Sequence, residues 1–189
     1  MLQKPVRLSR RRLVREIVAS LPEAHGRPIV LAFQPNLHSH LGEVVSKTAG
    51  VEIHAACDLR RRTLIMDSAL KSDPAEFKRI LIHEIFHFAW GRLGNPARAS
   101  FTRLIETERE RGARGELGWS AQRIKETLGE APSTVSRKYR EYICESFCDT
   151  GAWFYSGQPE HPEATLAQRY SSARARWFAE YFRHRKLSI

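Results

Sequence analysis

The residues best suited to catalysis form the run His83-Glu84-Ile85-Phe86-His87. Two histidines four residues apart project from the same face of a helix, so both imidazoles can bind one metal ion. Glu84 follows the first histidine, where its carboxylate can take a proton from a metal-bound water. The intervening and flanking residues are apolar, and burying two imidazoles and a carboxylate among them is costly without partners. A Zn²⁺ ion provides such partners, so the pattern predicts a zinc site.

A catalytic zinc ion usually has three protein ligands and one open position. No further histidine follows His87 closely, which disfavours the metzincin pattern and requires a third ligand from another part of the chain. Glu145 and Asp149 stand four residues apart on one face of an expected helix. We expect Glu145 to bind zinc and Asp149 to accept the distal N–H of a ligand histidine, which orients its ring. Glu141, one turn earlier, is the rival for the ligand role.

The combination of His83-Glu84-x-x-His87 with Glu145-x-x-x-Asp149 resembles the gluzincin branch of the zincin metallopeptidases, especially its small, minimal members. The resemblance covers residues 51–92 and 136–156. It implies an active-site helix, a glutamate-bearing helix that crosses beneath it, and a twisted sheet whose edge strand aligns the substrate. It also implies that the two histidines and Glu145 bind zinc, that Glu84 is the general base, and that Asp149 supports a ligand histidine.

Peptide hydrolysis also needs a donor that stabilises the tetrahedral oxyanion. The sequence offers Tyr142, Tyr155 and His161, and for each of them packing or surface exposure is the alternative. His38-Ser39-His40 contains a further histidine pair, for which a polar loop is the favoured interpretation. His54 falls on the expected edge strand, where solvent exposure is favoured over a role in a cleft.

The chain contains three cysteines, Cys57, Cys144 and Cys148. A small, odd number without a secretion signal indicates reduced thiols rather than a disulfide framework. Cys144 and Cys148 stand four residues apart and could pair on a metal ion. The favoured interpretation is buried small apolar side chains, because free cysteine is among the most buried residue types.

Apolar residues alternate with other residues from Val51 to Cys57, which is typical of a strand, and a second strand is expected at residues 63–68. The two strands together predict an antiparallel hairpin. The following helix is expected at residues 74–92. Its signals are Asp73 as N-cap, Pro74 at the first helical position, Glu76 completing a capping box, and Gly94 and Pro96 as the stop.

The fold class is therefore α+β, as a single zincin-like domain over residues 1–189. A small twisted sheet with the hairpin packs on the active-site helix and on a second helix that carries a ligand, with extra helices at both termini. The remaining elements are expected as a helix at 9–21, a strand at 28–34, a helix at 121–128 capped by Ser120, a helix opened by Pro132 and Ser133 that ends near Tyr155, and a helix at 162–184.

Thirty-one Lys and Arg residues against twenty-one Asp and Glu give a formal net charge of +10. Basic clusters occur at Arg10–Arg12, Arg60–Arg62 and Arg174–Lys186. Such a surface attracts phosphate backbones or acidic partners without sequence preference, although no motif for nucleic-acid recognition is evident. A solvated cationic face is the favoured interpretation.

We therefore expect a zinc metallopeptidase whose peptide or protein substrate binds by strand addition beside the hairpin at residues 51–68. Two alternatives stay open. One is a basic, nucleic-acid-associated protein, and the other is a partner-binding protein; both would have a zincin-like zinc site and little or no general proteolysis.

No run of the sequence reaches the ~18 apolar residues that a membrane helix requires. Residues 9–14 resemble a twin-arginine export signal, but Arg15 and Glu16 follow where such a signal needs an uncharged apolar stretch. We expect no membrane partner and a cytoplasmic location.

Overall fold

The computed structural model describes residues 10–40, 43–45, 50–129 and 133–189. The expected opening of a helix at Pro132 lies outside these residues. The helices are α1 (Arg10–Ala19), α2 (Pro74–Arg92), α3 (Asn95–Glu110), α4 (Trp119–Glu126), α5 (Arg137–Ser156) and α6 (Gln168–Phe182), with a short 3-10 helix η1 (Ser68–Ser72). The strands are β1 (Ala24–His25), β2 (Val30–Gln34), β3 (His38–His40), β4 (Glu43–Val45), β5 (Val51–Glu52), β6 (Ala55–Asp58), β7 (Thr63–Asp67) and β8 (Leu187–Ser188). Over the described ranges, no helix is long and apolar enough to span a membrane.

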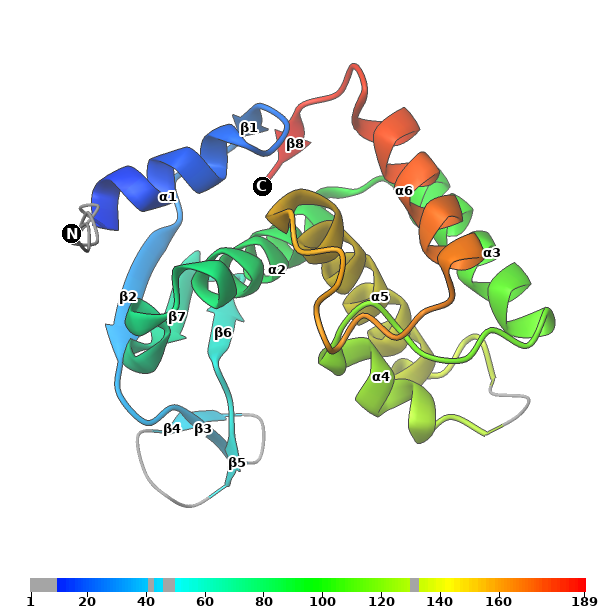
Figure 1. Ribbon diagram of the computed structural model, residues 1–189, viewed down its shortest axis with the longest axis horizontal. Helices are drawn as coiled ribbons and strands as arrows, with labels where there is room; N and C mark the ends of the chain where they lie inside the picture. The colour runs from blue at the N-terminus through cyan, green and yellow to red at the C-terminus, as the bar shows by residue number, and fades with distance from the viewer. Residues whose placement is uncertain (1–9, 41–42, 46–49, 130–132) are drawn as a thin grey trace, which may run out of the picture.

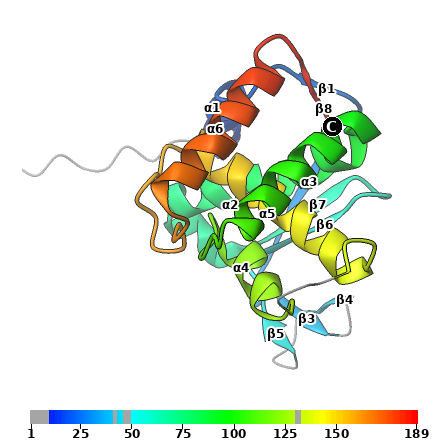
Figure 2. The same cartoon turned by 90° about the vertical axis from the view of Figure 1, so that its right-hand side faces the viewer.

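The fold class is α+β, as expected, with helices and small mixed sheets. Figure 1 shows α2 near the centre, with β2, β6 and β7 on one side of it and α3 to α6 on the other. Turned by 90°, the molecule shows β3, β4 and β5 at one end and the β1–β8 pair near the opposite end (Figure 2). Helix α2 is therefore the element that joins the strands to the helical half.

The main sheet has the order β2-β7-β6. Strands β6 and β7 pair antiparallel, with Ala55 opposite Met66, which confirms the expected hairpin. Strand β2 adds to the other side of β7 in parallel, with Val30 opposite Thr63. The sequence predicted β2 as a strand but not this pairing. Strands β2 and β6 are consequently the two edge strands of this sheet, and β6 also contacts α2.

The expected strand at residues 51–57 is divided in two. Val51 and Glu52 pair with β3 as β5, whereas Ala55 begins β6 and pairs with β7. Between them, the Ile53 N–H donates to Leu37 O at 3.0 Å and the Asp67 N–H donates to His54 O at 2.7 Å. The segment stays extended but exchanges one neighbour for another, and a period of two cannot reveal such an exchange.

Helix α2 has the predicted bounds. The Asp73 carboxylate accepts hydrogen bonds from the N–H groups of Ala75 and Glu76, so it satisfies two donors that the first turn leaves free. The reciprocal half of the capping box is not formed. The Asp73 N–H donates to Leu70 O, while the Glu76 carboxylate binds Arg79. The Glu76 carboxylate therefore pairs with Arg79 instead of accepting the Asp73 N–H.

The packing of α2 on α5 forms the centre of the core. Phe86 is fully buried and its ring lies against Phe147, with centroids 5.6 Å apart. Gly151 of α5 permits this approach, because a Cβ atom there would lie 2.7 Å from the Phe86 ring. The absence of a side chain at Gly151 therefore sets the spacing between the two helices that carry the site.

Three helix starts differ from the expectations. Helix α4 begins at Trp119 with Gly118 as N-cap, so Ser120 lies inside the helix rather than capping it. Helix α5 begins after Ser136, whose hydroxyl accepts the Tyr139 N–H, and not at residue 133. Helix α6 begins only at Gln168, because residues 162–167 form a turn and loop. The C-terminal end of α5 lies where expected, at left-handed Gly157.

A buried ionic cluster holds the helical half together. Arg174 of α6 is fully buried and forms ion pairs with Glu108 and Glu116, each at 2.7 Å. Lys125 of α4 and the hydroxyl of Tyr142 on α5 also contact the Glu116 carboxylate. The cluster links four helices around one loop, so it fixes the positions of α4 and α5 relative to each other.

Candidate metal centre

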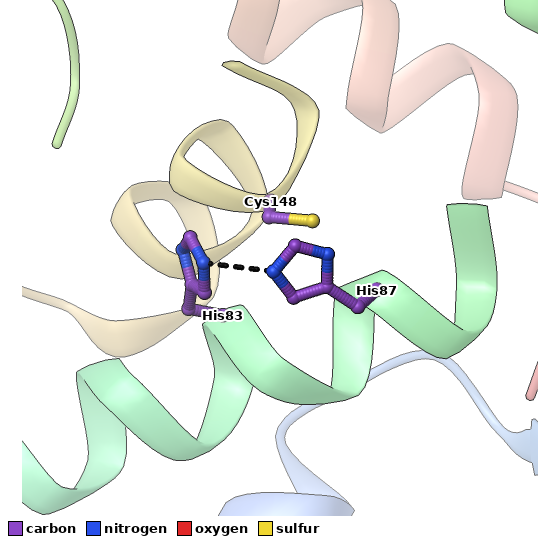
Figure 3. Close-up of side chains that lie close together, drawn as sticks. All are labelled: His83, His87 and Cys148. Atoms are coloured by element: carbon purple, nitrogen blue, oxygen red, sulfur yellow. Dashed lines mark hydrogen bonds between the residues drawn. The ribbon is translucent and has the colours of Figure 1, made fainter. Parts of the chain in front are cut away.

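Two histidines of α2 and one glutamate of α5 converge on a point between the helices. The Nε2 atoms of His83 and His87 lie 3.1 Å apart. The Oε2 atom of Glu145 lies 3.3 Å from His83 Nε2 and 3.7 Å from His87 Nε2. Figure 3 shows the imidazoles rising from successive turns of α2 and facing one another. The structure therefore brings together the three residues expected to be ligands.

The spacing of these atoms fits a zinc ion. Tetrahedral zinc with N and O ligands at about 2.0–2.1 Å separates neighbouring ligand atoms by roughly 3.3 Å. The three observed separations bracket that value. Two neutral imidazoles and one carboxylate are also the donor set of catalytic zinc sites with one open position.

Asp149 lies directly behind the first histidine. Its Oδ1 atom is 2.8 Å from His83 Nδ1, and its Oδ2 atom accepts the Ala121 N–H of α4 at 2.9 Å. The carboxylate is 2% exposed, so solvent does not compete for either contact. This arrangement directs His83 Nε2 toward Glu145, as expected of an acid behind a metal-bound histidine.

Glu84 lies beside the ligands. Its carboxylate, a ring nitrogen of His87 and the Cys57 thiol have ligand atoms within 4.8 Å of one another. Burial and the neighbouring Glu84 carboxylate raise the pKa of Cys57 well above its usual value, and the thiol is hydrogen-bonded to that carboxylate. Cys57 therefore stays protonated and acts as a donor that steadies the expected general base.

All three cysteines surround the centre. The Cys144 thiol lies 3.6 Å from His87 Nδ1, on the side of the ring away from His83. Cys148 is fully buried, and its Sγ atom lies within 4.8 Å of donor atoms of His83 and His87 (Figure 3). Cys148 is therefore a rival to Glu145 as third ligand. The carboxylate is favoured because it is within 3.7 Å of both Nε2 atoms.

The groups around His83 and His87 favour positive charge on the two imidazoles. Burial lowers the pKa of His83, but its contacts with Asp149 and Glu145 outweigh burial and leave that pKa well above the usual value. Burial also lowers the pKa of His87, and the contact with Cys144 and the charge of Glu145 raise it to about 9. These carboxylates stabilise positive charge at the place where a metal ion would sit.

A cleft of about 380 Å³ opens onto His83 and Glu84. One wall is the extended segment from β5 into β6, including Glu52, His54 and Ala55. The opposite wall is the exposed face of α4, with Trp119 and Arg123. Arg79 and Glu163 line the space between these walls. An extended chain can therefore lie between β6 and α4, over His83 and Glu84.

The three expected oxyanion donors lie away from this cleft. Tyr142 is fully buried, and its hydroxyl donates to Glu116. The ring of Tyr155 stacks on Phe86, with centroids 5.7 Å apart. His161 Nε2 lies 3.4 Å from the Glu76 carboxylate. The structure does not bring any of the three together with the metal-binding atoms, and each takes the packing or surface alternative.

The structure also locates most of the other residues that the sequence offered as ligands or cleft residues. Glu141, the rival ligand, is exposed and forms an ion pair with Arg137 at 2.8 Å, so it points away from the centre. His38 belongs to β3 and its Nδ1 atom lies 3.0 Å from Asn36 O. The side chain of His40 lies outside the description. His54 is exposed to solvent and also lines the cleft, so the two alternatives considered for it are compatible.

Sequence reasoning missed the contribution of α4. Trp119 and Arg123 stand one turn apart on the cleft side of this helix. No motif in the sequence marks them, and only the structure shows that Trp119 is exposed, with 58% of its surface accessible. Comparison of the chain with protein-family models, with curated proteins and with solved structures finds no significant match. The function must therefore be argued from the geometry of the site.

Proposed function

We propose that the chain is a zinc-dependent metallopeptidase that hydrolyses a peptide bond held in the cleft between β6 and α4. The observation that carries the proposal is the triangle formed by His83 Nε2, His87 Nε2 and Glu145 Oε2. Its dimensions and its donor atoms suit a zinc ion that keeps one position open toward the cleft. A bound Zn²⁺ ion supplies a water of pKa about 7 and polarises the substrate carbonyl.

The chain's own residues divide the remaining work. Glu84 lies next to His83 and faces the cleft, so its carboxylate can accept the proton of the attacking water and deliver it to the leaving amine. Asp149 keeps the His83 ring in its binding orientation. His54 lines the same cleft, so its imidazole is a candidate donor to the developing oxyanion.

The substrate would bind as an added strand. Strand β6 is an edge strand of its sheet, and Ala55 at its start and the preceding His54 line the cleft. A peptide that pairs with this edge gains main-chain hydrogen bonds without any requirement on its sequence. Recognition of particular residues must then come from the other wall of the cleft.

The test uses zinc-reconstituted wild type, Glu84→Gln and Glu145→Ala with a library of quenched fluorescent peptides. We expect Glu84→Gln to keep its zinc and to lose hydrolysis by at least 10²-fold, as removal of a general base does. Glu145→Ala should bind zinc more weakly. Undiminished hydrolysis by Glu84→Gln would refute the assignment of the base.

The alternative of a non-proteolytic protein that binds nucleic acid or a partner is motivated only by the +10 net charge. It predicts that wild type holds zinc, cleaves no peptide in the library, and binds nucleic acid with an affinity that falls steeply as salt rises. The same preparations of protein distinguish the two functions.

A further inference from the structure

The charges that line the cleft are not all neutralised. Arg79 forms ion pairs with Glu76 and with Glu163, the latter at 2.8 Å. Arg123 is exposed on the wall formed by α4, and no carboxylate within the described ranges forms an ion pair with it. The cleft therefore presents one guanidinium whose donors are available to a ligand.

Arg123 lines the same cleft as His83 and Glu84. Helix α4, which carries Arg123, is hydrogen-bonded through the Ala121 N–H to Asp149, the acid behind His83. A peptide whose scissile bond lies over His83 and Glu84 therefore passes Arg123. A carboxylate bound by Arg123 would therefore belong to a residue adjacent to that bond or close to it.

Hydrogen bonds fix the position of α4, the helix that carries Arg123, relative to the metal centre. Asp149 accepts the Ala121 N–H at 2.9 Å, and Glu163 accepts the Trp119 N–H at 3.1 Å. Gly118 brings the chain so close that a Cβ atom there would lie 2.4 Å from the Asp149 carboxylate. Because these contacts fix α4, the backbone that carries Arg123 is positioned before a substrate arrives, and only the side chain remains to be ordered on binding.

Trp119 stands one turn before Arg123 on the same face of α4. It is the exposed aromatic of this wall, and its ring provides an apolar surface beside the guanidinium. Such a surface excludes water from a bound carboxylate and strengthens its charge-assisted hydrogen bonds to the arginine.

We propose that Arg123 and Trp119 form a subsite for a carboxylate of the peptide substrate, either an acidic side chain or a free C-terminus, beside an apolar residue. The proposal rests on the proposed function, since it assigns the substrate class of the same cleft. A guanidinium donates two parallel N–H hydrogen bonds to a carboxylate. A neutral or basic side chain of the substrate cannot accept such a charge-assisted pair.

The test measures peptide binding rather than cleavage. Zinc-loaded Glu84→Gln protein is titrated with fluorescently labelled peptides that share an apolar neutral sequence and differ only in one Glu, Gln or Lys moved along it. We expect the best Glu peptide to bind about 10-fold more tightly than its Gln counterpart. Adding Arg123→Ala to this variant should remove the difference between the Glu and Gln peptides. The affinity for the Gln peptide should change by no more than about twofold.

Arg114 provides the matched control. It is exposed in the loop before α4 and does not line the cleft, so Arg114→Ala changes the net charge equally without touching the subsite. We expect Arg114→Ala to retain the preference for Glu. An equal loss in both variants would show that only the overall charge matters, and would overturn the subsite.

The two sources of the carboxylate are separated by a second pair of peptides, which end in a free carboxylate or in an amide. If the subsite takes a C-terminus, the preference follows the free carboxylate; if it takes a side chain, the preference follows Glu in amidated peptides. Failure of every carboxylate-bearing peptide to bind better than its neutral partner overturns the subsite, whether or not wild type hydrolyses any peptide. Absence of hydrolysis or of zinc binding in the wild type would instead contradict the proposed function.

Discussion

The Asp149 carboxylate connects His83 to helix α4. One oxygen lies 2.8 Å from His83 Nδ1, and the other accepts the Ala121 N–H. The same side chain therefore orients a metal-binding imidazole and fixes the helix that forms one wall of the cleft. The metal centre and the substrate wall are in this way positioned by one buried group.

Asp149→Asn tests this connection. An amide has one acceptor where the carboxylate has two, so it cannot serve both the imidazole and Ala121. We expect zinc affinity to fall about 10–100-fold, which a competition titration with a chromogenic chelator measures. Glu141→Gln on the same helix is the control, because Glu141 pairs with exposed Arg137. Equal affinities for the two variants would remove Asp149 from the site.

Gly151→Ala tests the spacing of the two ligand-bearing helices. The added methyl group would meet the Phe86 ring at 2.7 Å, so the helices must separate. We expect the free energy of unfolding to fall by about 1–3 kcal/mol in urea titrations, together with a loss of zinc affinity. Gly91→Ala is the control, since nothing lies within 4 Å of a Cβ atom there. A Gly151→Ala protein as stable as the control would contradict this packing.

The metal-free protein should lose stability as the pH rises. His87 has a pKa of about 9 in the folded chain, above the value of about 6.5 for an unfolded histidine. Its protonated form therefore stabilises the fold fully below about pH 6.5, and this contribution disappears as the pH rises through 9. The effect is on the order of 3 kcal/mol.

Urea titrations of chelator-treated wild type and His87→Gln across this range isolate the contribution of His87. We expect the difference in unfolding free energy between them to shrink toward high pH. Zinc should reverse the trend, because a metal-bound imidazole must be deprotonated and zinc affinity rises with pH. A difference that does not change with pH would show that Cys144 and Glu145 do not hold a protonated His87.

Arg174→Met tests the buried ionic cluster. Removing the arginine leaves Glu108 and Glu116 without their principal counter-charge in a buried setting. We expect a loss of about 3–5 kcal/mol in the free energy of unfolding. Arg176→Met, at an exposed position of the same helix, should be nearly neutral. Similar stabilities for the two variants would contradict a compensated buried network.

The sequence was most informative where local signals act within one helix. Asp73 and Pro74 predicted the start of α2, because capping depends on the backbone of the helix itself. Gly94 correctly marked its end, although in the structure it is the N-cap of α3 rather than a left-handed stop. Glu145 and Asp149 were identified because they stand one turn apart on a helix with an apolar face. That face packs the helix on the core, so the two carboxylates are expected beside the core. The hairpin followed from alternation and a polar turn.

Contacts between distant segments could not be predicted in this way. The pairing of β2 with β7 and the partner exchange within residues 51–57 depend on the register of strands far apart in the chain. The donors expected at Tyr142, Tyr155 and His161 were chosen by residue type, but burial and pairing with Glu116, Phe86 and Glu76 occupy them. Arg123 has no local motif, and only the fold places it beside the centre.

X-ray absorption spectroscopy of the zinc-reconstituted protein, combined with its metal content, tests the proposed zinc site directly. We expect one zinc ion per chain with a shell of nitrogen and oxygen atoms at about 2.0–2.2 Å, including two imidazoles. His83→Ala and His87→Ala should each reduce the zinc content. A sulfur atom at about 2.3 Å would contradict Glu145 as third ligand in favour of Cys148. A wild type that binds no zinc after reconstitution would contradict both the zinc site and the metallopeptidase function.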